Sequence, residues 1–197
     1  MKEKKEDRRV RRTQAALRQS LTALLSEKGL REITVKELTE RADVNRGTFY
    51  TYYQDIYDMV QQLEDELFEE FEAVISAYPV ATMHGGEDIY RILRDVLAFL
   101  RRNADFCTIL IGNGKDSSFI ERLKALVYEK VDVEWGQLYQ FPTPRMRAVT
   151  MAFLVGGVIG MIQAWIANGW QETPEELAGI ASQLIVRGLS EMGTLPE

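Results

Sequence analysis

The sequence predicts an all-α protein, with a three-helix head over residues 1–54 and a six-helix bundle over residues 55–197. Apolar residues recur at helical spacing along almost the whole chain, and no stretch shows the sustained alternation of a strand. Capping signals and glycines divide this pattern into nine segments. A chain of 197 residues with 46% hydrophobic content is long enough to bury a core.

The head is predicted to contain three helices. Leucines at helical spacing indicate a first helix over residues 10–28, and Gly29 provides its C-terminal cap. The segment Thr34–Glu37 fits a capping box, in which the hydroxyl and the carboxylate both bind amides at a helix start. After a tight break, Asn45 caps a third helix over residues 46–52. Two helices joined by so short a break form the helix-turn-helix arrangement.

The same signals predict the bundle. Thr143-Pro144 and Thr173-Pro174 each place a cap residue before a proline at the first helical position, which indicates a helix start. The predicted helices cover residues 55–77, 87–102, 105–112, 118–138, 144–168 and 174–187.

The cysteine and histidine counts exclude several classes of site. Cys107 is the only cysteine, so the chain has no intramolecular disulfide and no multi-cysteine metal site. His84 is the only histidine, which excludes a two-histidine zinc site. No nucleophile, base and orienting partner stand at a recognisable spacing. We therefore expect neither catalysis nor a bound metal or cofactor.

Charge is distributed unevenly along the chain. Ten of the first twelve residues are charged, and this start lacks the apolar stretch of a secretory signal, so we expect a cytoplasmic protein. Residues 1–54 contain 13 Lys or Arg against 8 Asp or Glu, whereas residues 55–197 contain 11 against 22. A basic head on an acidic body indicates that the head meets a polyanion such as DNA. A solvated tail explains the same pattern, and we expect the first half of the arm Lys2–Arg12 to be disordered.

The third predicted helix, with the sequence NRGTFYTY, carries hydroxyl groups and one cation. The second helix of a helix-turn-helix pair enters the major groove of DNA. There, tyrosine and threonine hydroxyls can bind phosphates, and Arg46 can bind phosphate or guanine. Phe49 and Tyr53 lie four residues apart on one face, and we expect them in the core. Tyr50 points elsewhere, so we expect it on the surface as a DNA contact.

Residues 10–60 resemble the DNA-binding domain of the TetR family of bacterial transcriptional repressors. The resemblance rests on the helix ending in Glu-Lys-Gly, the Ile-Thr-Val entry to the second helix and the Gly-Thr-Phe-Tyr recognition helix. It implies a homodimer that binds an inverted-repeat operator in double-stranded DNA. The family's operator contacts map onto Thr34, Arg46, Thr48, Tyr50 and Tyr52. The full set of DNA-contact candidates is Thr34, Lys36, Asn45, Arg46, Gly47, Thr48, Tyr50, Thr51 and Tyr52.

One position departs from the family. Members commonly have a lysine near the start of the fourth helix that binds a phosphate, and this chain has Ile56 there. We expect the loss of this ion pair to reduce the slope of the salt dependence of DNA binding by about one unit. The basic arm Lys2–Arg12 is a candidate for replacing that contact.

Residues 148–167 contain only two clearly polar side chains, which meets the length criterion for a membrane-spanning helix. Gly156 and Gly160 even have the spacing of membrane helix dimers. A helix buried in a dimer interface needs the same composition, and we favour that interpretation over a membrane because the other predicted helices are amphipathic. In the family the last two helices form the interface. The interface candidates are Phe153, Gly156, Gly157, Gly160, Ile180 and Leu184.

The resemblance also implies that an effector bound in the bundle controls the separation of the two heads through the fourth helix. We expect this effector to be small and hydrophobic or amphipathic. The candidate contacts are Phe99, Phe106, Cys107, Leu110, Tyr128, Trp135 and Trp165, with Met151 and Met161 as adaptable packing. The alternative regulatory input is a partner protein. An enclosed cavity larger than about 300 Å³ would favour the small molecule, and a filled core the partner.

Overall fold

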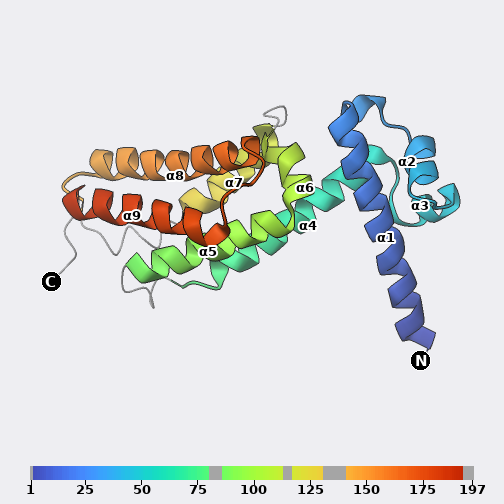
Figure 1. The fold of residues 1–197 in the computed structure, drawn as a ribbon, viewed down its shortest axis with the longest axis horizontal. Coiled ribbons are helices and arrows are strands. Elements are labelled where there is room, and N and C mark those ends of the chain that lie inside the picture. The colour runs from blue at the N-terminus through green and yellow to red at the C-terminus, as the bar shows by residue number, and fades with distance from the viewer. Residues whose placement is uncertain (1, 80–85, 113–116, 131–140, 193–197) are drawn as a thin grey trace. The chain divides into compact units, whose positions relative to one another are not determined.

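The computed structural model describes residues 2–79, 86–112, 117–130 and 141–192, and every regular element in these ranges is helical (Figure 1). The all-α prediction is confirmed. The chain forms two compact units, Met1–Leu67 and Phe68–Glu197. The first contains α1 (Lys2–Glu27), the 3-10 turn η1 (Leu30–Glu32), α2 (Val35–Arg41), α3 (Arg46–Tyr52) and the first half of α4 (Ile56–Ser76). The second contains the rest of α4, α5 (Gly86–Arg102), α6 (Ala104–Cys107), the π-helical segment η3 (Thr108–Gly112), α7 (Ser117–Lys130), α8 (Pro144–Ala167) and α9 (Pro174–Met192).

Side-chain caps begin two of the helices where the sequence predicts them. At the start of α3, Asn45 Oδ1 accepts a hydrogen bond from the Gly47 amide at 2.7 Å. Before α8, Thr143 Oγ1 accepts from the Met146 amide at 3.1 Å, and Pro144 is the first helical residue. Each cap satisfies an amide that has no acceptor within the first turn of its helix.

Several helix boundaries differ from the prediction. The arm is helical from Lys2 as part of α1, which corrects the expectation of a disordered first half; Lys, Glu and Arg are strong helix formers. The helix predicted over 105–112 is divided into α6 and η3. At the division, the Thr108 hydroxyl donates to the carbonyl of Ala104 at 2.7 Å and competes for a helical acceptor. Residues 131–138 of the next predicted helix lie outside the described residues.

The two units divide inside α4, at residue 67, whereas the sequence analysis places the division at residue 54. The reason is that the first half of α4 buries Ile56, Met59 and Leu63. A head of about 50 residues buries a small fraction of its surface and is only marginally stable, and these side chains enlarge its core. In the second unit, α5 packs along α9.

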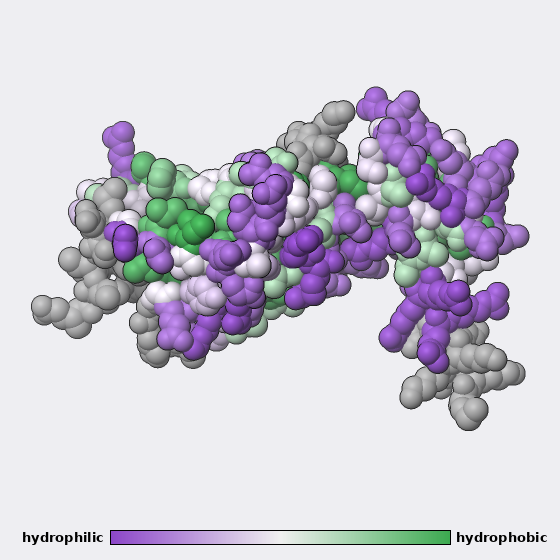
Figure 2. Space-filling model, viewed as in Figure 1, coloured by the Kyte–Doolittle hydropathy of each residue, from purple (hydrophilic) through white to green (hydrophobic). Residues whose placement is uncertain are grey.

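Apolar surface is exposed on the last two helices. Within the described residues, α8 is the one helix long and apolar enough to cross a membrane, with a mean hydropathy of 1.9 and 33% of that window buried. On α8, Phe153 is 78% exposed and Val149 is 64% exposed. On α9, Ile180 and Leu184 are also exposed. Figure 2 shows this surface in green over α8 and α9. A patch of this kind marks an interaction surface.

Two indole rings hold the connection between α8 and α9. The chain leaves α8 through Gly169 and Trp170, whose φ angles of 74° and 59° lie in the left-handed region. This conformation is strained for a bulky side chain. The Trp170 indole N–H donates to Thr108 Oγ1 at 3.2 Å, and its ring packs edge-on against Trp165 at 4.7 Å between centroids. These contacts tie the strained turn to η3.

The capping box at α9 is complete and gives a first prediction. The Glu176 amide donates to Thr173 Oγ1 at 3.2 Å, and the Thr173 amide donates to Glu176 Oε2 at 2.8 Å. The Thr173 hydroxyl donates to the same carboxylate oxygen at 3.0 Å, and the bonds from the Thr173 amide and hydroxyl lower the pKa of Glu176. Thr173→Ala is expected to lower the free energy of unfolding by about 1 kcal/mol, measured by urea denaturation. Thr173→Ser keeps the acceptor and should stay close to the parent; equal losses in both variants would contradict the cap.

Candidate DNA-binding surface and apolar cavity

Two buried rings fix the orientation of α3. Phe49 is fully buried and Tyr53 is 5% exposed, with their ring centroids 5.5 Å apart, so both expectations of core packing are confirmed. Tyr50 is 58% exposed, and it touches Phe49 only edge-on, at 5.4 Å between centroids. The buried face of α3 therefore turns the phenol of Tyr50 towards solvent, as the sequence predicts.

The other DNA-contact candidates surround Tyr50 in sequence and differ in exposure. Thr48 and Tyr52 are half-buried. The exposed candidates are Thr34, Lys36, Asn45, Arg46, Gly47, Tyr50 and Thr51. Lys36 lies 3.9 Å from Glu40, an exposed ion pair that holds its ammonium group only weakly. The structure thus places hydroxyl groups and the candidate cations Lys36 and Arg46 on the surface of α2 and α3.

Some of these residues also build the motif itself. Asn45 uses its side-chain oxygen to cap α3. A Cβ at Gly47 would lie 3.2 Å from that oxygen, so a side chain at this position would crowd the cap. The Thr51 hydroxyl donates to the Gly47 carbonyl at 3.0 Å. This hydroxyl can still accept a hydrogen bond, but it cannot donate a second one to DNA while it donates to the carbonyl.

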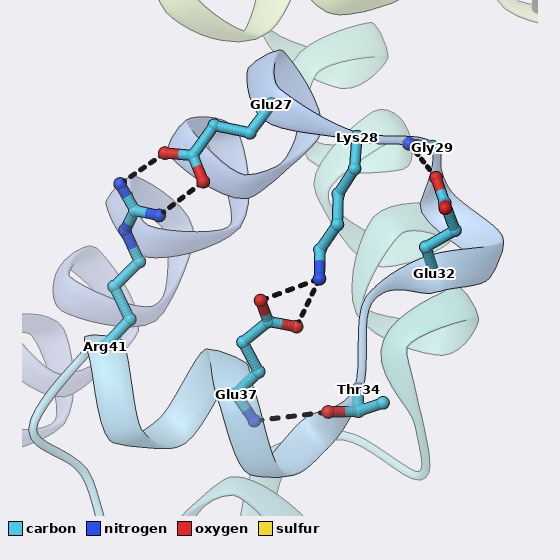
Figure 3. Close-up of polar contacts among 7 residues, drawn as sticks. All are labelled: Glu27, Lys28, Gly29, Glu32, Thr34, Glu37 and Arg41. Atoms are coloured by element: carbon cyan, nitrogen blue, oxygen red, sulfur yellow. Dashed lines mark hydrogen bonds and ion pairs between the residues drawn. The ribbon is translucent and has the colours of Figure 1, made fainter.

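Two ion pairs hold α2 against the end of α1 (Figure 3). Arg41 donates to both carboxylate oxygens of Glu27, at 3.0 and 2.8 Å, and these hydrogen bonds lower the pKa of Glu27. Lys28 Nζ lies 2.6 and 2.5 Å from the two carboxylate oxygens of Glu37. Surface pairs of this kind contribute little to stability. Their effect is to orient α2, and with it the turn that leads into α3.

The predicted capping box at α2 is only half formed. Thr34 Oγ1 accepts a hydrogen bond from the Glu37 amide at 3.3 Å, which confirms the cap (Figure 3). The Glu37 carboxylate binds Lys28 instead of returning to the amide of Thr34, because the ammonium group is the stronger partner. At the start of α4, Ile56 is 4% exposed, so its side chain belongs to the core of the head.

The second unit contains an apolar cavity of about 150 Å³ that is partly open to solvent. Its wall comes from α4, α5, η3, α7, α8 and α9 and consists almost entirely of aliphatic side chains. The lining residues are Phe71, Ile75, Tyr78, Ile89, Ile92, Leu93, Val96, Leu100, Ile111, Ile120, Leu123, Val127, Lys130, Leu154, Val155, Val158, Ile159, Ile162 and Ile185. A cavity needs at least about 10–15 Å³ on a comparable measure to hold one water, so this cavity has room for at most about ten water-sized groups.

A polar cluster stands behind the cavity wall. The Tyr78 hydroxyl donates to Asp95, and Arg94 binds the other oxygen of the same carboxylate at 2.8 Å. Burial raises the pKa of Asp95, but the hydrogen bonds from Tyr78 and Arg94 outweigh it and leave the pKa below its usual value. Burial and the bond to Asp95 raise the pKa of Tyr78. The Tyr78 hydroxyl therefore binds Asp95, which does not line the cavity.

The predicted effector contacts lie elsewhere in the bundle. Phe99, Phe106, Cys107, Leu110 and Trp165 are buried, Tyr128 is half-buried, and none of these six is among the lining residues. Of the two packing methionines, Met151 is buried and Met161 half-buried, also off the wall, and Trp135 lies outside the described residues. The residues predicted from the sequence are large and polarisable, whereas most residues that line the cavity are aliphatic and β-branched. Helical spacing marks those faces as buried but does not separate a packed core from a cavity.

The chain matches two models of one family of regulators. Residues 19–63 match the model of bacterial regulatory proteins of the tetR family. Residues 87–187, just over half of the chain, match a transcriptional regulator C-terminal region of the same family. The chain belongs to the TetR family. Its members are transcriptional regulators with a DNA-binding helix-turn-helix and are not enzymes, so α2 and α3 form the DNA-binding motif.

One curated relative and several solved structures are similar to this chain. The uncharacterized HTH-type transcriptional regulator YxbF of Bacillus subtilis is 22% identical over 174 residues, which are 87% of this chain and 44% of that protein. The chain therefore spans less than half of the length of this relative. The structure of the dihydroxyacetone kinase operon activator DhaS has a TM-score of 0.63 at 16% identity, covering 92% of this chain and 98% of that one. The regulator FadR of Bacillus subtilis, in complex with stearoyl-CoA, has a TM-score of 0.62 at 14% identity, covering 88% and 98%.

The polar cluster behind the cavity gives a pH-dependent prediction. Because the folded pKa of Asp95 lies below its unfolded value, its contribution to stability is present above the unfolded pKa and is lost as the pH falls through the folded pKa. Tyr78→Phe removes one hydrogen bond to Asp95 and should raise the carboxyl pKa, measured by NMR titration. The acid-induced fall in stability should also become shallower. Tyr128→Phe is the matched control, and an equal change in that variant would contradict the assignment.

Proposed function

We propose that this TetR-family regulator is a cytoplasmic homodimeric repressor that binds an inverted-repeat operator through α3 and is released by an effector bound in the second unit. The observation that carries the DNA-binding part is the opposite exposure of Phe49 and Tyr50 on α3. The buried ring fixes the helix, and the exposed phenol, with Arg46 at the first helical residue, can reach phosphates and base edges in the major groove.

The exposed apolar surface of α8 and α9 supports the homodimer. Phe153 and Leu184 are 78% and 69% exposed, which is costly for one chain alone. A Cβ added at Gly156, Gly157 or Gly160 would meet no atom within 4 Å, so this side of α8 leaves room for a second helix to approach closely. Two copies of α8 and α9 would form a four-helix bundle about a two-fold axis.

Dimerisation sets the geometry of the operator. A two-fold dimer presents two copies of α3, and half-sites one helical turn apart require them to be about 34–36 Å apart. An effector that changes this separation removes contacts from one half-site. Coupling of this kind is reciprocal, so the operator must weaken effector binding by the same factor.

Helix α4 contributes side chains to both units, which supports its role in coupling the cavity to the DNA-binding head. Ile56 and Met59 are buried in the first unit, whereas Phe71 and Ile75 of the same helix line the cavity in the second. We infer that a ligand in the cavity displaces this wall and that the displacement reaches the head through α4. The complex of the similar regulator FadR with stearoyl-CoA supports a ligand as the input.

The cavity helps to decide whether the regulatory input is a small molecule or a partner protein. At about 150 Å³ and partly open to solvent, it does not meet the expectation of an enclosed cavity larger than about 300 Å³, yet the core is not filled. With room for at most about ten water-sized groups, it favours a small effector. The sign of regulation is a separate question, because the similar protein DhaS is an operon activator. A transcription assay on the chain's own upstream region, with and without the protein, distinguishes repression from activation.

Replacement of Tyr50 tests the DNA-binding surface. Tyr50→Ala is expected to abolish specific binding to the chain's own upstream DNA in a gel-shift assay and to leave the circular dichroism spectrum unchanged, because the ring is exposed. Arg46→Ala should lower the slope of the salt dependence by about one unit. The matched control is Arg31→Ala, an exposed arginine outside the motif, which should keep the parent slope. Unchanged affinity in Tyr50→Ala would contradict the assignment of α3.

Replacement of Phe153 tests the dimer. Phe153→Asp places a charge in the proposed interface and should convert the dimer into a monomer, measured by light scattering after size-exclusion chromatography. The side chain is exposed in a single chain, so the monomer should remain folded. Ala73→Asp, at an exposed position of α4, is the control and should remain dimeric. A dimer that survives both Phe153→Asp and Leu184→Asp would place the interface elsewhere.

A further inference from the structure

We propose that the start of α1 is a second DNA-binding element, in which Arg8, Arg9 and Arg12 bind phosphates of the DNA backbone outside the groove that α3 enters. This inference rests on the DNA-binding part of the proposed function and adds a contact surface to it. Three observations support it: the lack of packing at the start of α1, the charge of its residues and the exposure of its arginines.

The first half of α1 extends from the head without packing against it. None of residues 8–16 is buried, and Leu17 is the first buried residue that follows them. At a rise of 1.5 Å per residue, Arg12 and Arg8 lie about 7 and 13 Å along the helix from Leu17. Figure 1 shows this end of α1 extending past α2 and α3. A helix without tertiary packing is only marginally stable below about 12–15 residues, so a bound partner would stabilise this half of α1.

The positive charge of the head is concentrated at this end of α1. Residues 2–7 contain three basic and three acidic residues, whereas residues 8–12 contain four arginines and no acidic residue. At 3.6 residues per turn, Arg8, Arg9 and Arg12 lie within about 100° of one another around the helix. Like charges three or four residues apart repel each other on a helix, and a polyanion removes this repulsion by neutralising them.

The three guanidinium groups are accessible to a ligand. Arg8, Arg9 and Arg12 are exposed, and no ion pair or hydrogen bond in the described part of the chain involves their side chains. Arg41, by contrast, is held by the carboxylate of Glu27. A guanidinium group binds a phosphate through two parallel hydrogen bonds. The three arginines can make such bonds without breaking an existing ion pair.

DNA is the polyanion that this surface fits, because α1 and α3 belong to the same compact unit. A helix of seven residues is about 10 Å long and the major groove is about 12 Å wide, so the rest of the unit lies over the backbones that border the groove. These backbones carry one negative charge per about 1.7 Å of duplex. Contacts to phosphates hold no sequence information, so the arginines add affinity and leave specificity to α3.

The salt dependence of DNA binding by the full chain tests the proposal. The double variant Arg8→Gln/Arg12→Gln removes two charges and keeps good helix formers at both positions. Its slope of log affinity against log salt should be about two units shallower than the parent slope, so between 50 and 200 mM salt its affinity should fall about tenfold less. Arg8→Lys/Arg12→Lys retains both charges and should keep the parent slope. Arg31→Gln, at an exposed arginine outside α1, is the matched control and should also keep it.

A backbone contact acts on every DNA sequence. The double glutamine variant should therefore weaken binding to the chain's own upstream DNA and to an unrelated duplex by the same factor. An unchanged slope, an equal change in Arg31→Gln, or a loss confined to the upstream DNA would overturn the proposal. A changed oligomeric state in size-exclusion chromatography would also overturn it, because the arginines would then bind protein. If the double variant fails to fold, Arg8→Gln and Arg12→Gln carry the same test singly, at about one unit of slope each.

Failure of this inference is distinguishable from failure of the proposed function. A parent slope in the double glutamine variant, with specific binding lost in Tyr50→Ala, would overturn the role of the arginines and leave α3 as the recognition helix. A shallower slope on the unrelated duplex, with unchanged specific binding in Tyr50→Ala, would support the arginines and contradict the assignment of α3.

Discussion

The burial of Phe49 is the constraint on which the DNA-binding surface depends. This ring occupies the core of the head, and together with the buried ring of Tyr53 it fixes the orientation of the seven-residue helix. The neighbouring side chains then have their places: Tyr53 packs beside the ring, Thr48 and Tyr52 are half-buried, and Tyr50 faces solvent. The exposure of Tyr50, the proposed DNA contact, is thus fixed by packing on the opposite face of α3. The ion pairs of Lys28 and Arg41 orient the preceding helix without adding much stability.

Local signals made the head predictable from sequence. Asn45 and Thr34 cap their helices through hydrogen bonds to amides two or three residues away, and such contacts need no knowledge of the rest of the fold. The spacing of Phe49 and Tyr53 likewise assigns them to one face. What the local pattern misses is competition from distant residues. The Glu37 carboxylate binds Lys28, nine positions away, and that choice depends on how α1 ends.

The cavity was not predictable, because it is a property of packing between helices. Ile92, Leu123 and Val158 are apolar residues at helical spacing, and the sequence predicts an ordinary core position for each of them. Their side chains line a space only because the helices that carry them leave one. The same holds for α8, whose apolar composition suits a membrane, a core or an interface. Composition sets the polarity of a helix, and only tertiary structure shows what remains uncovered.

The single thiol of the chain gives it a built-in reporter. Cys107 is fully buried at the end of α6, directly before η3, and Ile111 of η3 forms part of the cavity wall. A thiol-reactive reagent reaches this sulfur only when the surrounding structure opens. The rate at which Cys107 is modified therefore measures local opening around α6 and η3. A compound that fills the cavity and holds η3 in place would slow this reaction, and no engineered label is needed to observe it.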